Sequence, residues 1–111
     1  MATHIHRVTV RGRFADLTDD DRARLRAAAD DHEALRARFT PEGTLVYDGR
    51  LDFFSVRVEV RERTEDDTPP GDVTARAEDA GRGRALALLE GLGVSGRDLR
   101  TTSTDMASVW H

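Results

Sequence analysis

The chain has no cysteine and no lysine, and only 5% of its 111 residues are aromatic. Without cysteine it cannot form disulfides, thiolate metal sites, iron–sulfur clusters or a cysteine nucleophile. Without lysine it cannot use Schiff-base chemistry. All 17 basic residues are arginines, and arginine contacts carboxylates and phosphates bidentately. Arginine clusters are therefore the first places to look for an anion site.

Long hydrophobic runs are also missing. The longest, from Ala85 to Leu89, is far shorter than the roughly 20 residues of a membrane-spanning helix. The N-terminus has no apolar signal segment, so we expect a cytoplasmic protein that does not contact membranes. The net charge of −4 and the scarcity of aromatic residues argue against nucleic-acid binding. Length and composition predict one globular domain over residues 1–111.

Residues 4–14 predict a central strand on which the rest of the fold depends. Its even positions, from His6 to Phe14, are mostly apolar, whereas the odd positions from Arg7 to Arg13 are polar and cationic. This period of two predicts one face toward the core and one basic face. Residues 51–63 repeat the alternation. Their outward set is Ser55, Arg57, Glu59 and Arg61.

Two helices are predicted. The first begins after Thr18 as N-cap, with Asp21 completing a capping box, and runs to residues 36–38. Its expected buried stripe is Leu25, Ala28, Ala29, His32 and Leu35. The second is capped by Asp72 and runs to about Leu92. Its expected stripe is Val73, Ala77, Ala80, Leu88, Leu89 and Leu92. We attribute the glycine pair Gly81 and Gly83 to helix packing.

Two further strands complete the predicted order. Residues 38–47 predict an edge strand broken at Pro41-Glu42-Gly43, and Asp48-Gly49 predicts a two-residue hairpin turn to residues 51–63. Residues 97–110 predict a last strand with unassigned faces. The order is the βαββαβ pattern of a ferredoxin-like α+β sandwich, a four-stranded antiparallel-type sheet with two helices on one face. We expect the first and third strands to be adjacent and parallel at its centre.

The basic face of the sheet is the main candidate binding site. Neighbouring arginines repel one another unless an acid or a bound anion lies among them. An anionic small molecule, such as a carboxylate, phosphate or phenolate, would bind there. The predicted ligand-binding residues are Arg7, Arg11, Arg57, Glu59 and Arg61. Arg100 would join them if the last strand has the matching register. The alternative is a solvated face without a ligand.

The four histidines give weaker candidates. His4 and His6 share a strand face, and His111 would lie near them if the last strand runs antiparallel to the first. Three imidazoles can bind a divalent metal, but this spacing is not specific, and we expect no metal and no other cofactor. His32 is either a general base or a boundary histidine bonded to the backbone. We favour the second interpretation.

Two family resemblances accompany these patterns. Residues 7–14 superficially resemble the opening of an acylphosphatase, whose fold is ferredoxin-like. That family's Val-Gln-Gly-Val-x-Phe-Arg phosphate loop is replaced here by the acidic residues 15–20, so the resemblance implies the fold and not the activity. Residues 7–12, 39–45, 47–48 and 104–106 resemble an uncharacterised family of small actinobacterial proteins. That second resemblance spans nearly the whole chain and implies no mechanism.

The sequence leaves three functions open. The first is a non-catalytic domain that binds an anionic small molecule. The second is a cofactor-independent enzyme of the dimeric α+β barrel type, such as a cyclase, isomerase or monooxygenase, with His32 or a histidine near the termini as its base. The third is a structural or partner-binding module. We expect a homodimer, because a second copy often completes an exposed sheet face or edge.

Overall fold

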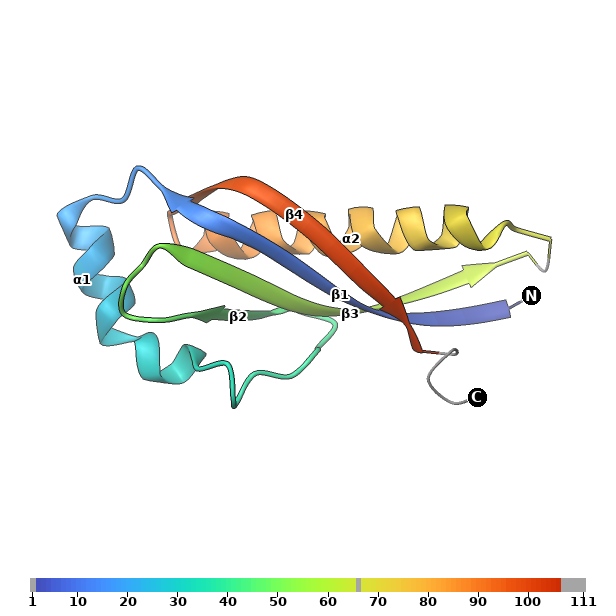
Figure 1. Cartoon of the computed structure of the whole chain (residues 1–111), viewed down its shortest axis with the longest axis horizontal. Helices are drawn as coiled ribbons and strands as arrows, with labels where there is room; N and C mark the ends of the chain where they lie inside the picture. The colour runs from blue at the N-terminus through green and yellow to red at the C-terminus, as the bar shows by residue number, and fades with distance from the viewer. Residues whose placement is uncertain (1, 66, 107–111) are drawn as a thin grey trace.

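The computed structural model describes residues 2–65 and 67–106. Their elements are β1 (Ala2–Ala15), α1 (Asp19–Ala27), the short 3₁₀ helix η1 (Ala29–His32), β2 (Thr44–Tyr47), β3 (Phe53–Thr64), α2 (Pro70–Gly91) and β4 (Ser95–Asp105). They form an α+β architecture with one four-stranded antiparallel sheet (Figure 1). Within these ranges, no helix has the length and apolar character needed to cross a membrane.

The strand order is β2-β3-β1-β4, so β2 and β4 are the edges, as predicted. The central pair does not run as expected. Strands β1 and β3 are antiparallel, with Val8 opposite Val58 and Val10 opposite Val56. The prediction of a parallel central pair was wrong because β2 and β3 form a hairpin. That hairpin turns the chain back, so β3 runs opposite to both of its neighbours.

The alternation predicted for the two central strands is confirmed. Val8, Val10 and Val56 are fully buried on the face that α2 covers. The buried residues of α2 are Val73, Ala77, Gly81, Ala85 and Leu89. Of the predicted stripe, Val73, Ala77 and Leu89 are buried and Leu88 and Leu92 are partly buried against the core, whereas Ala80 is exposed because the buried residues follow a spacing of four. The helix also begins at Pro70 rather than after an Asp72 cap, because proline suits a first helical position.

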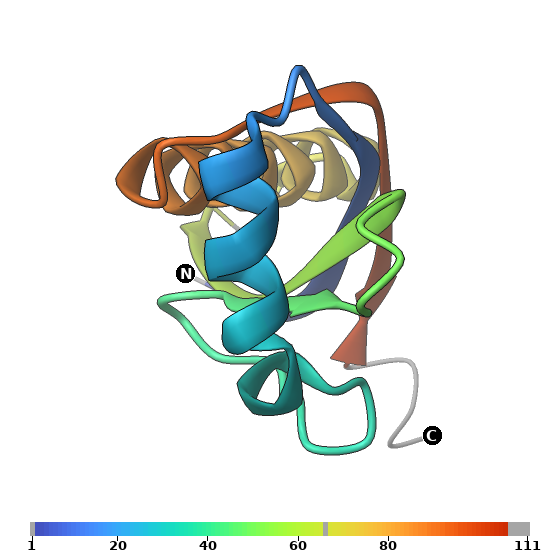
Figure 2. The same ribbon diagram turned by 90° about the vertical axis from the view of Figure 1, so that its left-hand side faces the viewer.

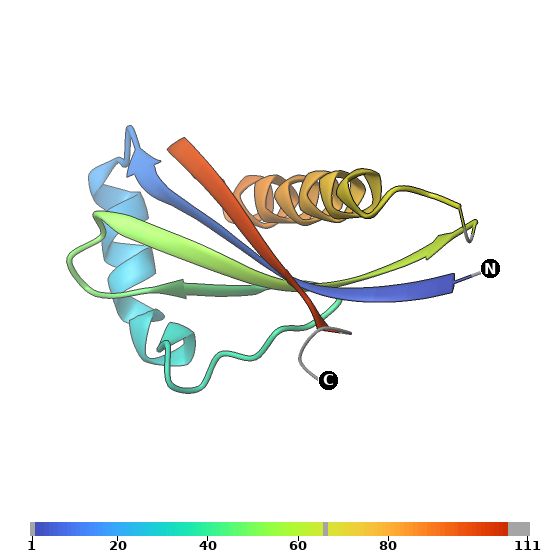
Figure 3. The same cartoon turned by 45° about the vertical axis from the view of Figure 1, so that its right-hand side comes forward.

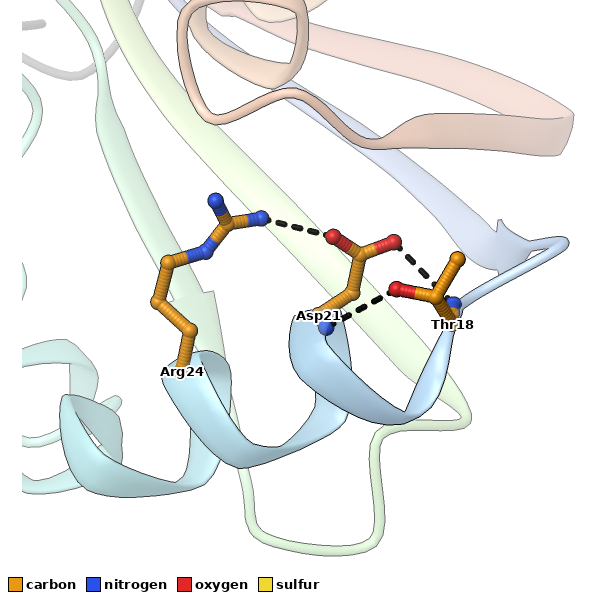
Figure 4. A network of polar contacts seen from close by, with 3 residues as sticks. All are labelled: Thr18, Asp21 and Arg24. Atoms are coloured by element: carbon orange, nitrogen blue, oxygen red, sulfur yellow. Dashed lines mark hydrogen bonds and ion pairs between the residues drawn. The ribbon is translucent and has the colours of Figure 1, made fainter.

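The start of α1 is confirmed and its end is not. Thr18 and Asp21 form the predicted capping box, and Arg24 donates to the same carboxylate (Figure 4). Backbone hydrogen bonding at Thr18 lowers the pKa of Asp21, with Arg24 adding to the effect. The helix ends at Ala27, because the following aspartates favour turns over helix. Leu35, predicted to be buried, is 99% exposed.

Tyr47 connects the end of α1 to the sheet. Its hydroxyl donates to the Leu25 carbonyl at 2.7 Å, and Leu25 is the buried residue of α1. The His32 ring stacks on Tyr47 at 4.9 Å, and its Nδ1 lies 3.0 Å from the Leu45 carbonyl oxygen. A carbonyl can only accept, so the ring donates from Nδ1. Figure 2 shows α1 crossing the end of the sheet, where these contacts hold it.

The predicted edge strand and its turn differ from the structure. Strand β2 covers only Thr44–Tyr47, and Thr40 forms an isolated bridge to Val58 before the predicted break at residues 41–43. The connection to β3 is longer than Asp48-Gly49 alone. Its positive φ of 60° falls on Leu51, whose side chain is buried in the core. The Leu51 amide donates to the Asp48 carbonyl, which closes a four-residue turn over residues 48–51. The last strand ends at Asp105, and the predicted residues 107–110 lie outside the described ranges.

Gly81 and Gly83 provide a matched test of helix packing. A Cβ at Gly81 would lie 2.5 Å from Cγ1 of Val8, whereas a Cβ at Gly83 would meet nothing within 4 Å. We expect Gly81→Ala to destabilise the fold by about 1–3 kcal/mol through overpacking. Gly83→Ala should stabilise it by about 0.5–1 kcal/mol through helix propensity. Denaturant unfolding of both variants measures the difference, and equal effects would contradict the close approach of α2 to β1.

The buried hydroxyl of Tyr47 predicts an alkaline loss of stability. Burial, assisted by the charge of Asp31, raises the pKa of Tyr47 above its ordinary value of 10.0. The stability that the neutral Tyr47 hydroxyl contributes to the fold is therefore complete below pH 10. It is lost as pH rises through the folded-state pKa. Tyr47→Phe should cost about 1 kcal/mol at neutral pH, and this gap should narrow above pH 10. Tyr47 is the one tyrosine in the chain, so phenolate absorbance reports its titration directly.

Candidate functional site

The face of the sheet opposite α2 carries the predicted basic residues. Strand register places Arg7, Thr9 and Arg11 of β1 here. Their neighbours on the same face are Val46, Phe53, Ser55, Arg57, Glu59, Arg100, Thr102 and Thr104. The sequence suggested that this whole face is free, but the structure shows that part of it is covered. Residues 33–40, which we call the strap, cross part of it on the side away from α2 (Figure 3).

Arg57 holds the strap in place. Its Nη1 donates to the carbonyl oxygens of Ala34 at 3.0 Å and Ala37 at 2.8 Å. Two guanidinium groups contact the Phe39 ring, with Arg7 at 5.4 Å and Arg57 at 5.9 Å from its centroid. Such cation–π contacts add attraction on a partly buried surface. These two arginines, predicted to bind a ligand, therefore contact the protein's own chain.

Two other predicted ligand-binding residues contact one another. Arg61 Nε lies 3.4 Å from Glu59 Oε1. Arg61 is exposed, so solvent screens this pair and its contribution to stability is small. Glu59 is thus an acid among the arginines of this face, and the arginine paired with it is Arg61 on the same strand. Of the five predicted residues, Arg7 and Arg11 have no side-chain hydrogen bond or ion pair within the described ranges, and Arg11 also lacks the cation–π contact that Arg7 makes.

Strand β4 places two arginine pairs directly across from each other. Arg11 of β1 is opposite Arg100, as the sequence allowed, and Arg13 is opposite Arg97 beyond a β-bulge. Directly opposed like charges destabilise a sheet. Within the described ranges, the side chains of Arg97 and Arg100 also lack hydrogen bonds and ion pairs, and Arg13 stacks on Phe53 at 5.1 Å. We call these four residues the arginine ladder: Arg11, Arg13, Arg97 and Arg100.

Two adjoining hollows lie beside the arginine ladder. The basic hollow, of 590 Å³, is lined by three ladder arginines and by Asp98. The second, which we call the apolar hollow, has a volume of 680 Å³ and lies between the sheet and the strap. Both hollows are lined by Arg11, Gly12 and Phe53. Ligand pockets typically have volumes of about 300–1,000 Å³, so each hollow is large enough for a small molecule.

The histidines do not gather into a metal site within the described ranges. His4 Nδ1 and His6 Nε2 lie 3.7 and 4.0 Å from the same carboxylate oxygen of Asp105. His6 is buried and both of its ring nitrogens lack a hydrogen-bond partner there. His111, the third predicted ligand, lies outside the described residues. His32 bonds to the backbone and stacks on Tyr47, the contacts of a boundary histidine.

Sequence reasoning missed part of the arginine ladder. Arg13 belongs to the same outward set as Arg7 and Arg11, so the alternation alone could have included it. Arg97 could not be placed, because a β-bulge shifts the register between β1 and β4. A bulge inserts a residue into one strand and changes which side chains lie opposite each other. The strap was missed as well, since its contacts with Arg57 span more than 19 positions of sequence.

Comparison with known proteins gives a family without a function. Residues 1–110 match a family of unknown function (DUF6204). No curated protein and no solved structure matches the chain. This match confirms the predicted resemblance to an uncharacterised family. The family has no known function, so a function must be inferred from the geometry of the site.

Replacing Arg57 tests whether it positions the strap. Arg57→Met removes both hydrogen bonds to the strap, so we expect at least about tenfold faster trypsin cleavage after Arg36 or Arg38. Arg61→Met is the matched control, because it removes an arginine of the same strand whose side-chain polar contact within the described ranges is with Glu59 and not with the strap. Equal cleavage rates in the two variants would show that Arg57 does not hold the strap.

Proposed function

Since the chain belongs to DUF6204, a family of unknown function, we propose from its geometry that it binds a small anionic molecule at the arginine ladder. The main observation that supports this proposal is that Arg11 and Arg100 lie directly opposite each other, and no acid within the described ranges is paired with either of them. This refines the sequence prediction, because Arg11 keeps its expected role while Arg7 and Arg57 contact the strap. The proposed binding residues are Arg11, Arg13 and Arg100.

Electrostatics favours an anion in the basic hollow. Three guanidinium groups and one carboxylate line it, in a chain whose overall net charge is −4. An anion between opposed arginines converts a repulsive contact into two charge-assisted hydrogen-bonded contacts. Arginine suits this role because its planar donors match carboxylate and phosphate oxygens. The hollow therefore selects anions although the protein as a whole is acidic.

An enzymatic function is the second candidate, and its geometry is less favourable. His32, the proposed base, lines a separate 440 Å³ hollow between η1 and the C-terminal part of α2. Its Nδ1 is bonded to the Leu45 carbonyl, which leaves Nε2 as the nitrogen that accepts a proton. A general base must lie within hydrogen-bonding reach of the substrate proton that it removes. An anion bound at the arginine ladder would lie on the other face of the sheet from this histidine.

Three further sequence predictions stay proposals. The element and strand orders support a ferredoxin-like fold. Strand β4 supports a homodimer, because an 11-residue edge strand has backbone groups that a second copy can pair with. The measurement for the dimer is molecular mass in solution. The cytoplasmic location predicted from the sequence also stays a proposal.

Anion binding is tested with inorganic phosphate, added at constant ionic strength against chloride. In low salt, R11Q/R100Q should be more stable than the wild type by about 0.2–1 kcal/mol, because the opposed charges are gone. Phosphate should raise the melting temperature of the wild type by mass action and raise that of the variant much less. The order of stability should therefore reverse as phosphate is added.

The control is R76Q/R82Q, which removes two exposed arginines of α2 and changes the net charge equally. It should respond to phosphate as the wild type does. An equal phosphate response in all three proteins would show general salt stabilisation and would refute binding at the ladder.

A further inference from the structure

We infer that the ligand is a monoanionic amphiphile, with its anionic head at the arginine ladder and an apolar body in the apolar hollow. This inference rests on the proposed anion site and adds the ligand's shape and charge. The two hollows adjoin at Arg11, Gly12 and Phe53, which line both of them. Together they form a trough across the sheet face from β4 to β2. One molecule long enough to occupy both ends would contact charge at one end only.

Exposed hydrophobic side chains mark the apolar end of the trough. Leu35 is 99% exposed and Phe53 is 64% exposed, and both line the apolar hollow. They are two of the three most exposed large hydrophobic residues in the described ranges, and the third, Leu86, lies on α2. Leu35 comes from the strap and Phe53 from β3, so they border the hollow from different elements. An apolar body between them would remove both from water, which is favourable in proportion to the area covered.

Carboxylates around the apolar end argue for a single negative charge on the ligand. Asp30, Glu33 and Asp48 line this hollow, with Arg11 as its cation at the junction. Glu33 is 3.8 Å from Arg36, and Asp48 accepts from the Arg50 backbone, so both are already engaged. A second anionic group at this end would meet like charge. The trough thus discriminates between a monoanion and a dianion of equal length.

Arg57 holds the part of the strap that lines the apolar hollow. Ala34 accepts a hydrogen bond from Arg57 and also lines the apolar hollow beside Leu35. Arg57 is therefore a positioning residue for one wall of the trough. Its guanidinium is directed to the strap carbonyls and not to the proposed ligand.

The experiment compares butyrate, octanoate and suberate as probes by calorimetric titration. Octanoate should bind about 10- to 100-fold more tightly than butyrate, since burying each methylene gives up to roughly threefold to fourfold in affinity. Suberate has the length of octanoate and a second carboxylate, and it should bind at least about tenfold more weakly than octanoate. R11Q/R100Q should lose affinity for butyrate and octanoate alike.

The variants L35S and F53S separate the apolar contact from the anion contact. Both should reduce the advantage of octanoate over butyrate. L35S should also leave butyrate affinity unchanged, because Leu35 lines the apolar hollow alone, whereas Phe53 borders both hollows and stacks on Arg13. L86S is the matched control, because it replaces an exposed leucine outside the trough and should keep the full advantage. Equal affinities for the three probes in the wild type would refute the proposal of an amphiphilic ligand. They would not contradict the proposed anion site. Absence of binding by butyrate, octanoate and phosphate would overturn both proposals.

Discussion

The alternation of side chains along β1 constrains the rest of the structure. This strand pairs with β3 on one side and β4 on the other, so its register decides what both neighbours present. A slip of one residue would move Val8 and Val10 into solvent and turn the arginines into the core. Burial of the valines against α2 therefore fixes the outward direction of Arg11. The core and the proposed binding face are two consequences of one register.

Register also gives chemically identical arginines different roles. Arg57 lies where the strap carbonyls are within reach, and Arg7 shares the Phe39 ring with it. Arg11 faces Arg100 across the strand pair and has no acid as a partner within the described ranges. Composition cannot separate these cases, since every basic residue of the chain is an arginine. The cross-strand neighbour decides whether a guanidinium stabilises the fold or is available to an anion.

What the sequence could predict follows from the range of the interactions involved. Local patterns predicted the inward valines, the Thr18 capping box and the edge position of β2, because alternation and capping act over a few residues. Leu35 fitted the same local helical spacing and is nevertheless exposed. Helix α1 has already ended at Ala27, and hydrogen bonds from Arg57 to the carbonyls of Ala34 and Ala37 hold the segment over the sheet. A bulge likewise made Arg97 unpredictable, since it breaks the count on which register depends.

The strap makes the proposed site depend on residues that do not contact the ligand. Ala34 is both an acceptor for Arg57 and part of the apolar wall, so losing Arg57 would displace that wall. A weaker affinity in an Arg57 variant would therefore not show that Arg57 binds the ligand. Arg11 differs, because it lies where the two hollows join and its side chain makes no hydrogen bond or ion pair within the described ranges. A change in anion affinity on replacing Arg11, with the strap intact, is the observation that reports direct contact.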